Sequence, residues 1–428
     1  MRIAYLVSRY PAVSHTFIAR EVAALRARGI ALQTMSIRRA TPDHVLTQAD
    51  REAYESTIAL LPASPCAFVR AHVRALRRCP SRYVRTLFAA LRTGTGLRGK
   101  RKQVTYFAGA VLVLEHCRRL RISHLHAHFE RPSADVAMLA SLLSTTGESM
   151  RELTWSFTAH LPAEYMDDRS ALSRKVMDAA MVVCVSHFGR SQLMALVPDA
   201  QWTKLVVVRC GLTNAELECP SRCHAARDPA EVVMVARFDP IKGHAVLLHA
   251  LSRLRRRGVE VTANLVGFGP MVGRLVALAD ELAIGDRVNF VGPVAADQVA
   301  DFYARSVICC LPSFGEGVPV ALMEAMAIGL PTIASRIMGI PELVEDNVTG
   351  LLVTPGRDDE LADAIELLLG NPAMRQAYGQ AGRQKVRNDY SIEIAAARLH
   401  QLFDGIMTAA SNGSSRHEVA PLRAGARR

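Results

Sequence analysis

Short apolar runs rich in β-branched residues alternate along this chain with longer stretches of helical periodicity. Strands that are apolar on both faces and separated by helices form a parallel sheet covered by helices on both sides. Because the pattern occurs in each half of the chain, it predicts an α/β protein with two doubly wound domains. The runs predicted as strands are 2–8, 30–37, 124–129, 153–160, 181–186 and 205–210, and then 231–237, 261–267, 287–292, 307–312, 331–335 and 350–353.

The division between the two halves is predicted where a stretch with two prolines and mixed charge shows no periodicity. Ser391 is placed to cap a last helix, which we expect to return toward the first domain. Ligands of such sheets bind at the carboxyl ends of the strands, so the expected site is the cleft between the domains. The expected segments are 1–213 and 231–390 for the domains, 214–230 for the linker, 391–408 for the last helix and 411–428 for a disordered tail.

Composition and charge narrow the class of protein. The chain has 428 residues, half of them hydrophobic and 21% charged, which excludes a disordered or fibrous protein. The net charge of +12 favours an acidic partner, such as nucleic acid, an anionic membrane surface or a phosphorylated substrate. Neither a signal peptide nor a run of about 18 apolar residues is present. We therefore expect a cytoplasmic protein, with peripheral attachment to the inner face of the plasma membrane as an open alternative.

The nine cysteines are irregularly spaced, and several lie inside apolar runs, among them Cys184, Cys309 and Cys310. This placement predicts buried, reduced thiols. Cys219 and Cys223 precede His224, but no second ligand pair stands at a zinc-like spacing. We therefore expect no metal site there.

The most informative stretch begins at Ser313 and runs through Gly317, Val318 and Pro319 into an apolar helix over 320–328. Pro319 suits the first helical position, where a missing amide proton costs nothing. The amides of Gly317, Val318 and Val320 are then free at the helix start. Together with the helix dipole they predict an anion site that needs no metal.

Glu316 and Glu324 are eight residues apart in this stretch. Glu324 lies on a helix that is apolar almost all round, and a buried carboxylate needs hydrogen-bond partners. A ligand with vicinal hydroxyls, such as a ribose, would supply them. A buried arginine or a backbone amide would do so equally well, and the spacing leaves both interpretations open.

Arg237 and Lys242 flank a turn directly after the first strand of the second half. Two cations at this place suit a diphosphate, although surface cations would look the same. Gly267 opens a Gly-Phe-Gly-Pro turn after the next strand. That turn is no dinucleotide fingerprint, because Gly273 falls out of register.

The motifs of the second half follow each other in the order Arg237 with Lys242-Gly243, Gly267-Phe268-Gly269-Pro270, Glu316-x7-Glu324-Ala325-Met326, Gly329-Leu330-Pro331, Gly339-Ile340-Pro341-Glu342 and Thr349-Gly350-Leu351-Leu352-Val353. Those of the first half are Tyr10-Pro11-x-x-Ser14-x-Thr16-Phe17-Ile18-x-x-Glu21, His126-Ala127-His128-Phe129 and Phe157-Thr158-Ala159-His160. The second-half motifs resemble glycosyltransferase family 4, whose members are retaining enzymes with the GT-B fold. The first half is similar to a branch of that family that builds bacterial capsular polysaccharides and exopolysaccharides, such as colanic acid.

The resemblance implies two Rossmann-like domains that face a central cleft, and a role for each matching residue. Arg237 and Lys242 would hold the donor diphosphate, Glu316 the donor sugar hydroxyls and Glu324 the nucleotide ribose. His160 would hydrogen-bond a hydroxyl of the donor sugar, while His126 and His128 are expected to be scaffold. The expected donor-binding residues are Arg237, Lys242, Gly267, Glu316, Gly317, Val318, Pro319, Val320 and Glu324, and the expected catalytic residues are His160, Glu316, Arg237 and Lys242.

The reaction that the resemblance implies is attack of an acceptor hydroxyl from the face that the diphosphate leaves, without an assigned protein nucleophile. The protein would mainly stabilise negative charge on the leaving group. No Asp-x-Asp motif follows a strand, so we expect no essential metal and no cofactor. The chain departs from the family pattern at Phe268, at Met338 and over 161–165, which leaves the donor sugar open. A UDP-sugar is favoured, with GDP-mannose as the alternative.

A basic stretch over 56–114 contains neither Asp nor Glu, and aromatic residues are interleaved with its cations. An arginine-bearing helical face beside apolar residues is typical of a segment that lies on anionic lipid. A solvated face that binds the acceptor, or nucleic acid, would give a similar pattern. Lipid-linked acceptors in the resembled branch favour the membrane, and we expect no nucleic acid partner. The cations are Arg70, Arg74, Arg77, Arg78, Arg82, Arg85, Arg92, Arg98, Lys100, Arg101 and Lys102.

The sequence thus predicts transfer of a sugar from a nucleotide-diphosphate sugar to a glycan or lipid-linked saccharide in cell-surface polysaccharide synthesis. A nucleotide-sugar epimerase of the same fold is one alternative, but it does not normally combine the Lys-Gly pair with Glu-x7-Glu. A catalytically silent, basic membrane-surface protein is the other. The complete set of donor-site residues argues against it.

Overall fold

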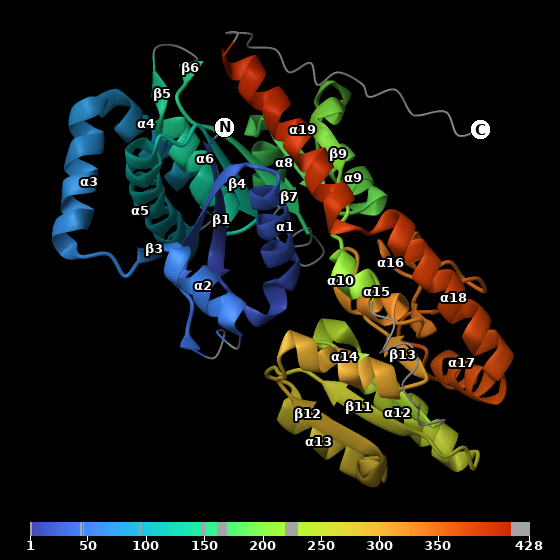
Figure 1. The fold of residues 1–428 in the computed structure, drawn as a ribbon. Helices are drawn as coiled ribbons and strands as arrows, with labels where there is room; N and C mark the ends of the chain where they lie inside the picture. Colours follow the sequence, from blue (N-terminus) through green and yellow to red (C-terminus); the bar gives the residue numbers. More distant parts are fainter. Residues whose placement is uncertain are drawn as a thin grey trace, which may run out of the picture.

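The structure is a computed structural model that describes residues 2–42, 45, 47–94, 96–146, 150–160, 169–218 and 230–411. The chain forms two α/β domains, one above the other in Figure 1. Each domain has a parallel sheet with helices on both faces, so the predicted fold class is confirmed. Among the described helices, none is long and apolar enough to span a bilayer.

The first domain contains a seven-stranded parallel sheet in the order β3-β2-β1-β4-β7-β8-β9. All six strands predicted in this half are present. The edge strand β3 was missed, because its run of four apolar residues is short and directly precedes Pro62. The strands are β1 (Arg2–Tyr10), β2 (Ala31–Arg39), β3 (Ile58–Leu61), β4 (His124–His128), β7 (Thr154–Ala159), β8 (Met181–Cys184) and β9 (Leu205–Val207), with a small hairpin of β5 (Thr145–Thr146) and β6 (Met150–Arg151).

The second domain contains a six-stranded parallel sheet in the order β12-β11-β10-β13-β14-β15. The central strand β10 pairs with β11 on one side and β13 on the other, so that Val232 lies opposite Ala263 and Ile308. All six predicted strands are present. They are β10 (Glu231–Val235), β11 (Thr262–Val266), β12 (Val288–Gly292), β13 (Ile308–Leu311), β14 (Thr332–Ser335) and β15 (Gly350–Val353).

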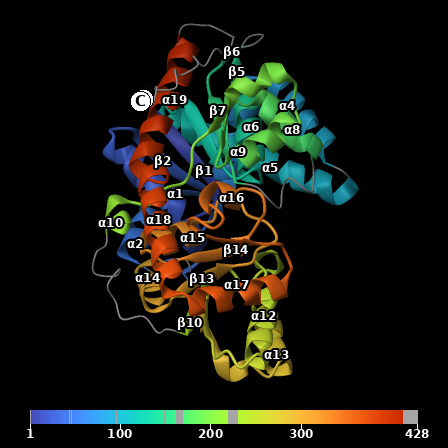
Figure 2. The same ribbon diagram turned by 90° about the vertical axis from the view of Figure 1, so that its right-hand side faces the viewer.

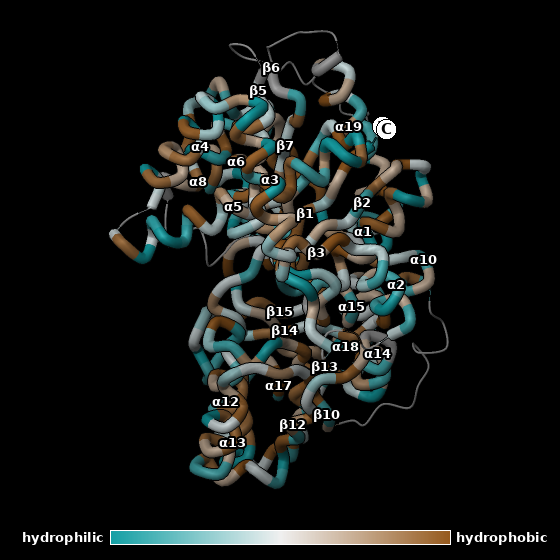
Figure 3. Tube along the Cα trace, turned by 90° about the vertical axis from the view of Figure 1, so that its left-hand side faces the viewer, coloured by the Kyte–Doolittle hydropathy of each residue, from teal (hydrophilic) through white to brown (hydrophobic). Residues whose placement is uncertain are grey.

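Helices cover both sheets, and Figure 3 shows that they carry both hydrophobic and hydrophilic residues, as amphipathic covering helices do. Those of the first domain are α1 (Thr16–Ala27), α2 (Gln48–Ser56), α3 (Pro65–Arg78), α4 (Pro80–Thr93), α5 (Gly96–Leu120), α6 (Ser133–Leu143), α8 (Arg169–Asp178) and α9 (His187–Met194). The remaining helices are α10 (Asn214–Leu217), α12 (His244–Arg256), α13 (Val272–Glu281), α14 (Ala296–Arg305), α15 (Val320–Ala327), α16 (Ile340–Leu343), α17 (Asp358–Gly370), α18 (Pro372–Asp389) and α19 (Ile392–Ser411).

The chain crosses between the domains twice, and the two crossings run side by side. Leu212 donates its amide to the carbonyl of Tyr390 at 2.8 Å and accepts from the amide of Ile392 at 2.9 Å. The segment predicted as a linker begins with α10, which Thr213 caps. Its residues 219–229, which include Cys219 and Cys223, lie outside the described residues.

The last helix packs on the first domain, although it follows the second in sequence (Figure 2). The Ser391 hydroxyl accepts from the amide of Glu393 at 3.2 Å, as a capping residue would. Leu399 and Phe403 of α19 are fully buried against Ile3 of β1 and Ile18 of α1. The helix was predicted to end at residue 408 but continues to Ser411, which was predicted to open the tail. The rest of the predicted tail, residues 412–428, lies outside the described residues.

Candidate active site

A cavity of ≈ 500 Å³ lies between the two domains and is lined by residues of both. It lies beside the carboxyl ends of the central strands, where ligands of doubly wound sheets bind. All ten residues that the sequence singled out for catalysis or donor binding line this one cavity. They are His160, Arg237, Lys242, Gly267, Glu316, Gly317, Val318, Pro319, Val320 and Glu324.

Two cations of the second domain face the cavity in different electrostatic surroundings. Lys242 ends a short turn after β10, and its Nζ lies 2.7 Å from Oε1 of Glu316. Ser313 donates its hydroxyl to the same oxygen at 2.8 Å, which fixes the buried Glu316 carboxylate. The Arg237 side chain is 55% exposed, and its ion pair with Asp239 is long, at 3.4 Å. Its guanidinium is therefore the more available of the two for an anion.

The N-terminus of α15 also lines this side of the cavity. Pro319 was predicted at the first helical position, but the structure places it at the N-cap, with an extended ψ of 117°. The prediction was wrong by one residue, because a proline suits the extended cap as well as the first turn. Leu322 and Met323 make the first helical bonds, to the carbonyl of Pro319. The amide of Val320 therefore precedes the bonded part of α15 and lies at the cavity wall.

Gly317 brings the second domain into direct contact with the first. A Cβ atom at this position would lie 2.4 Å from the carbonyl oxygen of His160. Gly339 is equally constrained, because its Cβ would lie 1.8 Å from the carbonyl oxygen of Gly317. The loop that carries Glu316 therefore packs backbone to backbone against the segment that carries His160.

The buried partner of Glu324 is an arginine of the other domain. Arg20 of α1 places Nη2 at 2.7 Å from the Glu324 carboxylate and 2.5 Å from that of Glu216 on α10. Of the two partners left open for Glu324, the described structure thus contains the arginine. Burial raises the pKa of Glu324, and the charge of Arg20 opposes this rise. Nothing in the sequence pointed to Arg20 beyond its place next to Glu21 in the opening motif.

His160 lies at the end of β7, enclosed by rings. Its centroid is 4.8 Å from that of Phe17 and 4.7 Å from that of Phe129, and it stacks on His128 at 26°. Phe129 has a left-handed φ of 70°, which costs about 1–3 kcal/mol and turns the chain sharply after β4. Burial lowers the pKa of His160 well below its usual value. The ring is therefore neutral near pH 7 and acts as a hydrogen-bonding group.

His124 and His126 form a ladder with hydroxyl groups between β4 and β7. The ring nitrogens of His124 lie 2.8 and 2.7 Å from the hydroxyls of Thr154 and Ser156. Those of His126 lie 2.7 and 2.8 Å from the hydroxyls of Ser156 and Thr158. Each side chain is fully buried and links the two strands, as scaffold residues do.

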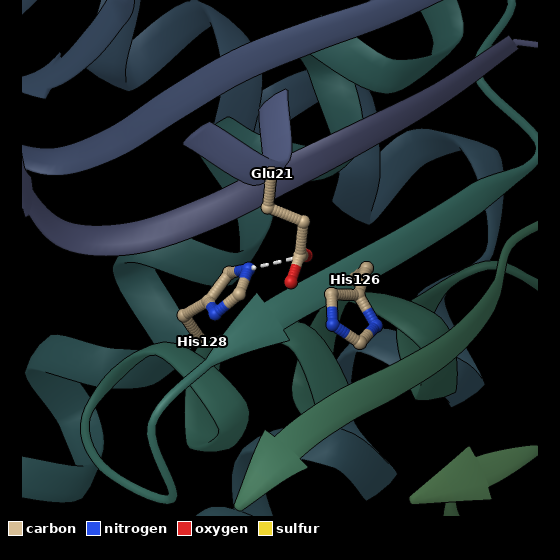
Figure 4. A group of neighbouring side chains, drawn as sticks. All are labelled: Glu21, His126 and His128. Atoms are coloured by element: carbon tan, nitrogen blue, oxygen red, sulfur yellow. Dashed lines mark ion pairs between the residues drawn. The ribbon is translucent and has the colours of Figure 1, made fainter. Parts of the chain in front are cut away.

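Among the described residues, one cluster has the composition of a metal site. Figure 4 shows Glu21, His126 and His128, whose ligand atoms lie within 4.8 Å of one another. Both nitrogens of His126 already face hydroxyl groups, and His128 lies between Glu21 and His160. The arrangement is therefore that of a hydrogen-bonded network.

Glu342 has a structural role that the sequence did not reveal. Its carboxylate accepts from the amides of His187 and Phe188 at 2.9 and 2.8 Å. These are the first residues of α9, so a side chain of the second domain satisfies a helix start of the first. The residue was visible within Gly-Ile-Pro-Glu, but nothing in the pattern indicated its partner.

Comparisons with known proteins agree with this architecture. The family model described as glycosyl transferases group 1 matches residues 223–385. A GDP-mannose-dependent alpha-(1-6)-phosphatidylinositol monomannoside mannosyltransferase of Mycobacterium tuberculosis is 34% identical, over 64% of this chain and 72% of that protein. The amylovoran biosynthesis glycosyltransferase AmsK of Erwinia amylovora is 30% identical, over 52% of this chain and 56% of its own length.

Solved structures share the fold over nearly the whole chain. A sucrose-phosphate synthase of Thermosynechococcus elongatus superposes with a TM-score of 0.72 at 21% identity, covering 96% of this chain and all of its own. HepE of Anabaena, in a complex with UDP, gives 0.69 at 17% identity, covering 94% of this chain and all of its own. With the two sheets, the shared cavity and the matching relatives, the chain belongs to the group 1 glycosyltransferases and is a glycosyltransferase of the GT-B fold.

Proposed function

We propose that this enzyme transfers a sugar, with retention of configuration, from a nucleoside-diphosphate sugar to a glycan or lipid-linked saccharide in cell-surface polysaccharide synthesis. The observation that carries the proposal is the convergence of Arg237, Lys242 and the start of α15 on one cavity that His160 also lines. The names of the relatives support it: one is GDP-mannose-dependent and another serves amylovoran synthesis. The HepE structures include complexes with UDP and UDP-glucose.

The electrostatics of the cavity suit a diphosphate leaving group. Lys242 pairs with Glu316, and its ammonium group keeps two further donors for phosphate oxygens. Arg237 supplies a fork that can bind two oxygens at once. The amides at the start of α15 add partial positive charge without a metal ion. These groups would stabilise the charge that develops on the leaving diphosphate, so the proposed reaction uses neither a metal nor a cofactor.

The remaining roles follow from position. Glu316 would accept from hydroxyls of the donor sugar, and Glu324 from those of the ribose. His160 would face the sugar from the first domain. The acceptor hydroxyl would then attack from the face that the diphosphate leaves. We favour a UDP-sugar as donor, with GDP-mannose as the second candidate.

The donor assignment is tested by thermal unfolding in the presence of UDP-, GDP- and ADP-sugars. We expect one of the first two to raise the unfolding temperature, because a ligand that binds only the folded state stabilises it. Arg237→Ala and Glu316→Ala should remove transfer and weaken this stabilisation. Arg274→Ala is the matched control, because Arg274 is exposed on α13 and does not line the cavity. Stabilisation by none of the sugars would contradict the proposal, and product analysis separates transfer from epimerisation.

We also propose that the first domain lies on an anionic membrane. Val69, Val73 and Leu76 on α3 are 58%, 39% and 42% exposed and, spaced at four and three residues, share one helix face. Phe88 on α4 and Leu97 on α5 are 57% and 69% exposed. Large exposed apolar residues on adjoining helices mark an interaction surface.

Arginines lie on the same helices, α3, α4 and α5. A hollow of ≈ 320 Å³ between the helices is lined by Arg78, Arg82, Arg85 and Arg118, together with Cys79. The charge suits the phosphate of an anionic lipid headgroup, while the apolar side chains suit the acyl boundary. A membrane position would also bring the enzyme to a lipid-linked acceptor.

Co-sedimentation with vesicles tests the membrane proposal. We expect binding to vesicles that contain phosphatidylglycerol and little binding to pure phosphatidylcholine. Val69→Ser with Phe88→Ser should reduce it, whereas Leu367→Ser, at an exposed leucine of α17 in the second domain, should not. Equal binding to both kinds of vesicle would remove the electrostatic part of the argument.

A further inference from the structure

We propose that Glu21 and His128 are positioning residues that set the orientation and tautomer of His160 through a buried chain of polar contacts. The chain begins at Tyr5 on β1 and passes through Glu21 on α1 and His128 on β4 to His160, at the cavity. Its residues are far apart in the sequence, so no local motif indicates that they are in contact.

The contacts are continuous. The Tyr5 hydroxyl donates to Oε1 of Glu21 at 2.6 Å. The same oxygen lies 3.3 Å from Nε2 of His128, and Figure 4 shows the carboxylate directed at that ring. Nδ1 of His128 lies 3.2 Å from Nε2 of His160. Tyr5 and His128 are fully buried and Glu21 is 8% exposed, so water does not replace any of these partners.

The carboxylate determines the direction of the chain. The negative charge of the Glu21 carboxylate favours the proton of His128 on Nε2, the nitrogen that faces it. In that tautomer Nδ1 of His128 accepts, and His160 donates from Nε2. The remaining nitrogen of His160, Nδ1, is left as an acceptor for a hydroxyl proton in the cavity. The stacked ring of His128 and the rings of Phe17 and Phe129 hold this orientation.

The matched control is His124. It lies on the same strand as His128 and is equally buried, but its partners are the hydroxyls of Thr154 and Ser156. His124→Gln therefore perturbs the same strand without touching the proposed chain. Glu21→Gln is the conservative variant, since its amide oxygen can still accept from Tyr5 and present a negative dipole to His128. Glu21→Leu removes the acceptor at similar volume.

The kinetic test rests on the proposed transferase function. We expect Glu21→Leu to lower kcat by about 10- to 100-fold, with little change in the KM of the donor, as for other residues that orient a site histidine. Glu21→Gln should restore most of the rate, and His124→Gln should leave it within about threefold of the wild type, because contacts outside the chain add independently. In a His160→Ala background, Glu21→Leu should change kcat by less than about twofold, because a residue that acts through His160 has nothing left to orient. If Glu21→Leu lowers kcat in that background as much as it does in the wild type, the proposal is overturned.

A second measurement does not depend on transferase activity. Long-range proton–nitrogen correlation NMR of the wild type, labelled at histidine and assigned with His160→Gln, reports the tautomer of each ring. We expect the Nε2–H tautomer at His160. The Nδ1–H tautomer would overturn the proposal even if the enzyme transfers sugar. So would one equivalent of tightly bound metal in the purified protein, since an ion between Glu21 and His128 would replace their direct contact. The expected tautomer with no transfer would leave the chain intact and contradict only the proposed function.

Discussion

Gly317 has two roles, one in the packing between the domains and one in the predicted anion site. Its amide belongs to the predicted anion site, and its missing side chain lets the carbonyl of His160 approach. The motif indicated the first of these roles from sequence, because a glycine before a helix start offers its amide to a ligand. The second depends on a residue of the other domain, 157 positions away in the chain, and could not be predicted.

We expect Gly317→Ala to weaken donor binding strongly, although it adds only one methyl group. The new methyl group would lie 2.4 Å from the His160 carbonyl oxygen, so the loop or the domain must shift. Donor affinity measured by calorimetry should fall at least about tenfold, since a shift of 1 Å in a binding group costs on that order or more. Gly273→Ala is the control, because a methyl group on this residue of α13 would meet no other atom within 4 Å. Equal donor affinity in the two variants would contradict the tight contact.

Buried histidines should make the protein sensitive to acid. Burial lowers the pKa of His124 to about 3 and that of His244 to about 4, and it also lowers those of His126 and His160. An unfolded histidine takes up its proton near pH 6.5, so protonation favours the unfolded chain below that pH. The free energy of unfolding should fall as pH drops from about 6.5 toward 4, with each histidine contributing up to about 1.4 kcal/mol per pH unit. Urea titrations at pH 7, 6 and 5 check this, and an unchanged stability would refute it.

At the scale of elements, the apolar runs located the strands reliably because both sheets are parallel and buried on both faces. No alternation of polar residues was needed to recognise them. The edge strand β3 was not predicted, since a half-buried run of four residues is too short to show a strand pattern. The helix α15 begins at Val320 as predicted, but Pro319 is its N-cap and not its first residue, because proline is compatible with both neighbouring positions.

The helix α9 depends on a residue outside its own domain. The Glu342 carboxylate accepts from two amides at its start, which otherwise lack helical partners. We expect Glu342→Ala to lower the free energy of unfolding by about 1–2 kcal/mol, in the range for loss of a helix cap. Glu345→Ala is the control, because the Glu345 side chain is 50% exposed and pairs with Lys385 within the second domain. Chemical denaturation of both variants distinguishes them, and equal losses would argue against the cross-domain cap.

At the scale of the whole molecule, the site was predictable as a list of residues but not as an arrangement of two domains. Each motif follows a strand, so the general location of the second-domain residues could be inferred. The partner of Glu324 is Arg20, which is 304 positions away. Such a contact depends on the angle between the domains, and no local sequence pattern predicts that angle.

Arg20 is therefore expected to couple the domains. Arg20→Met leaves the partly buried carboxylates of Glu216 and Glu324 without their cation, which should cost about 1–3 kcal/mol, less than a fully buried pair because Glu216 is 36% exposed. Burial raises the pKa of Glu324 and Arg20 opposes the rise, so in the variant the loss should shrink as the pH falls and that carboxyl takes up a proton. Arg257→Met, which removes exposed pairs within one domain, is the control for urea unfolding. A loss that does not change with pH would count against this account.

The return of α19 to the first domain has a consequence for synthesis on the ribosome. The core of that domain includes Leu399 and Phe403, yet its last strand ends at Val207. At usual translation speeds, the final helix emerges roughly ten to forty seconds after the sheet it covers. During that interval the nascent domain displays the apolar surface of Ile3, Ile18 and Val22. The first domain therefore receives its last covering helix only after the whole second domain has been synthesised.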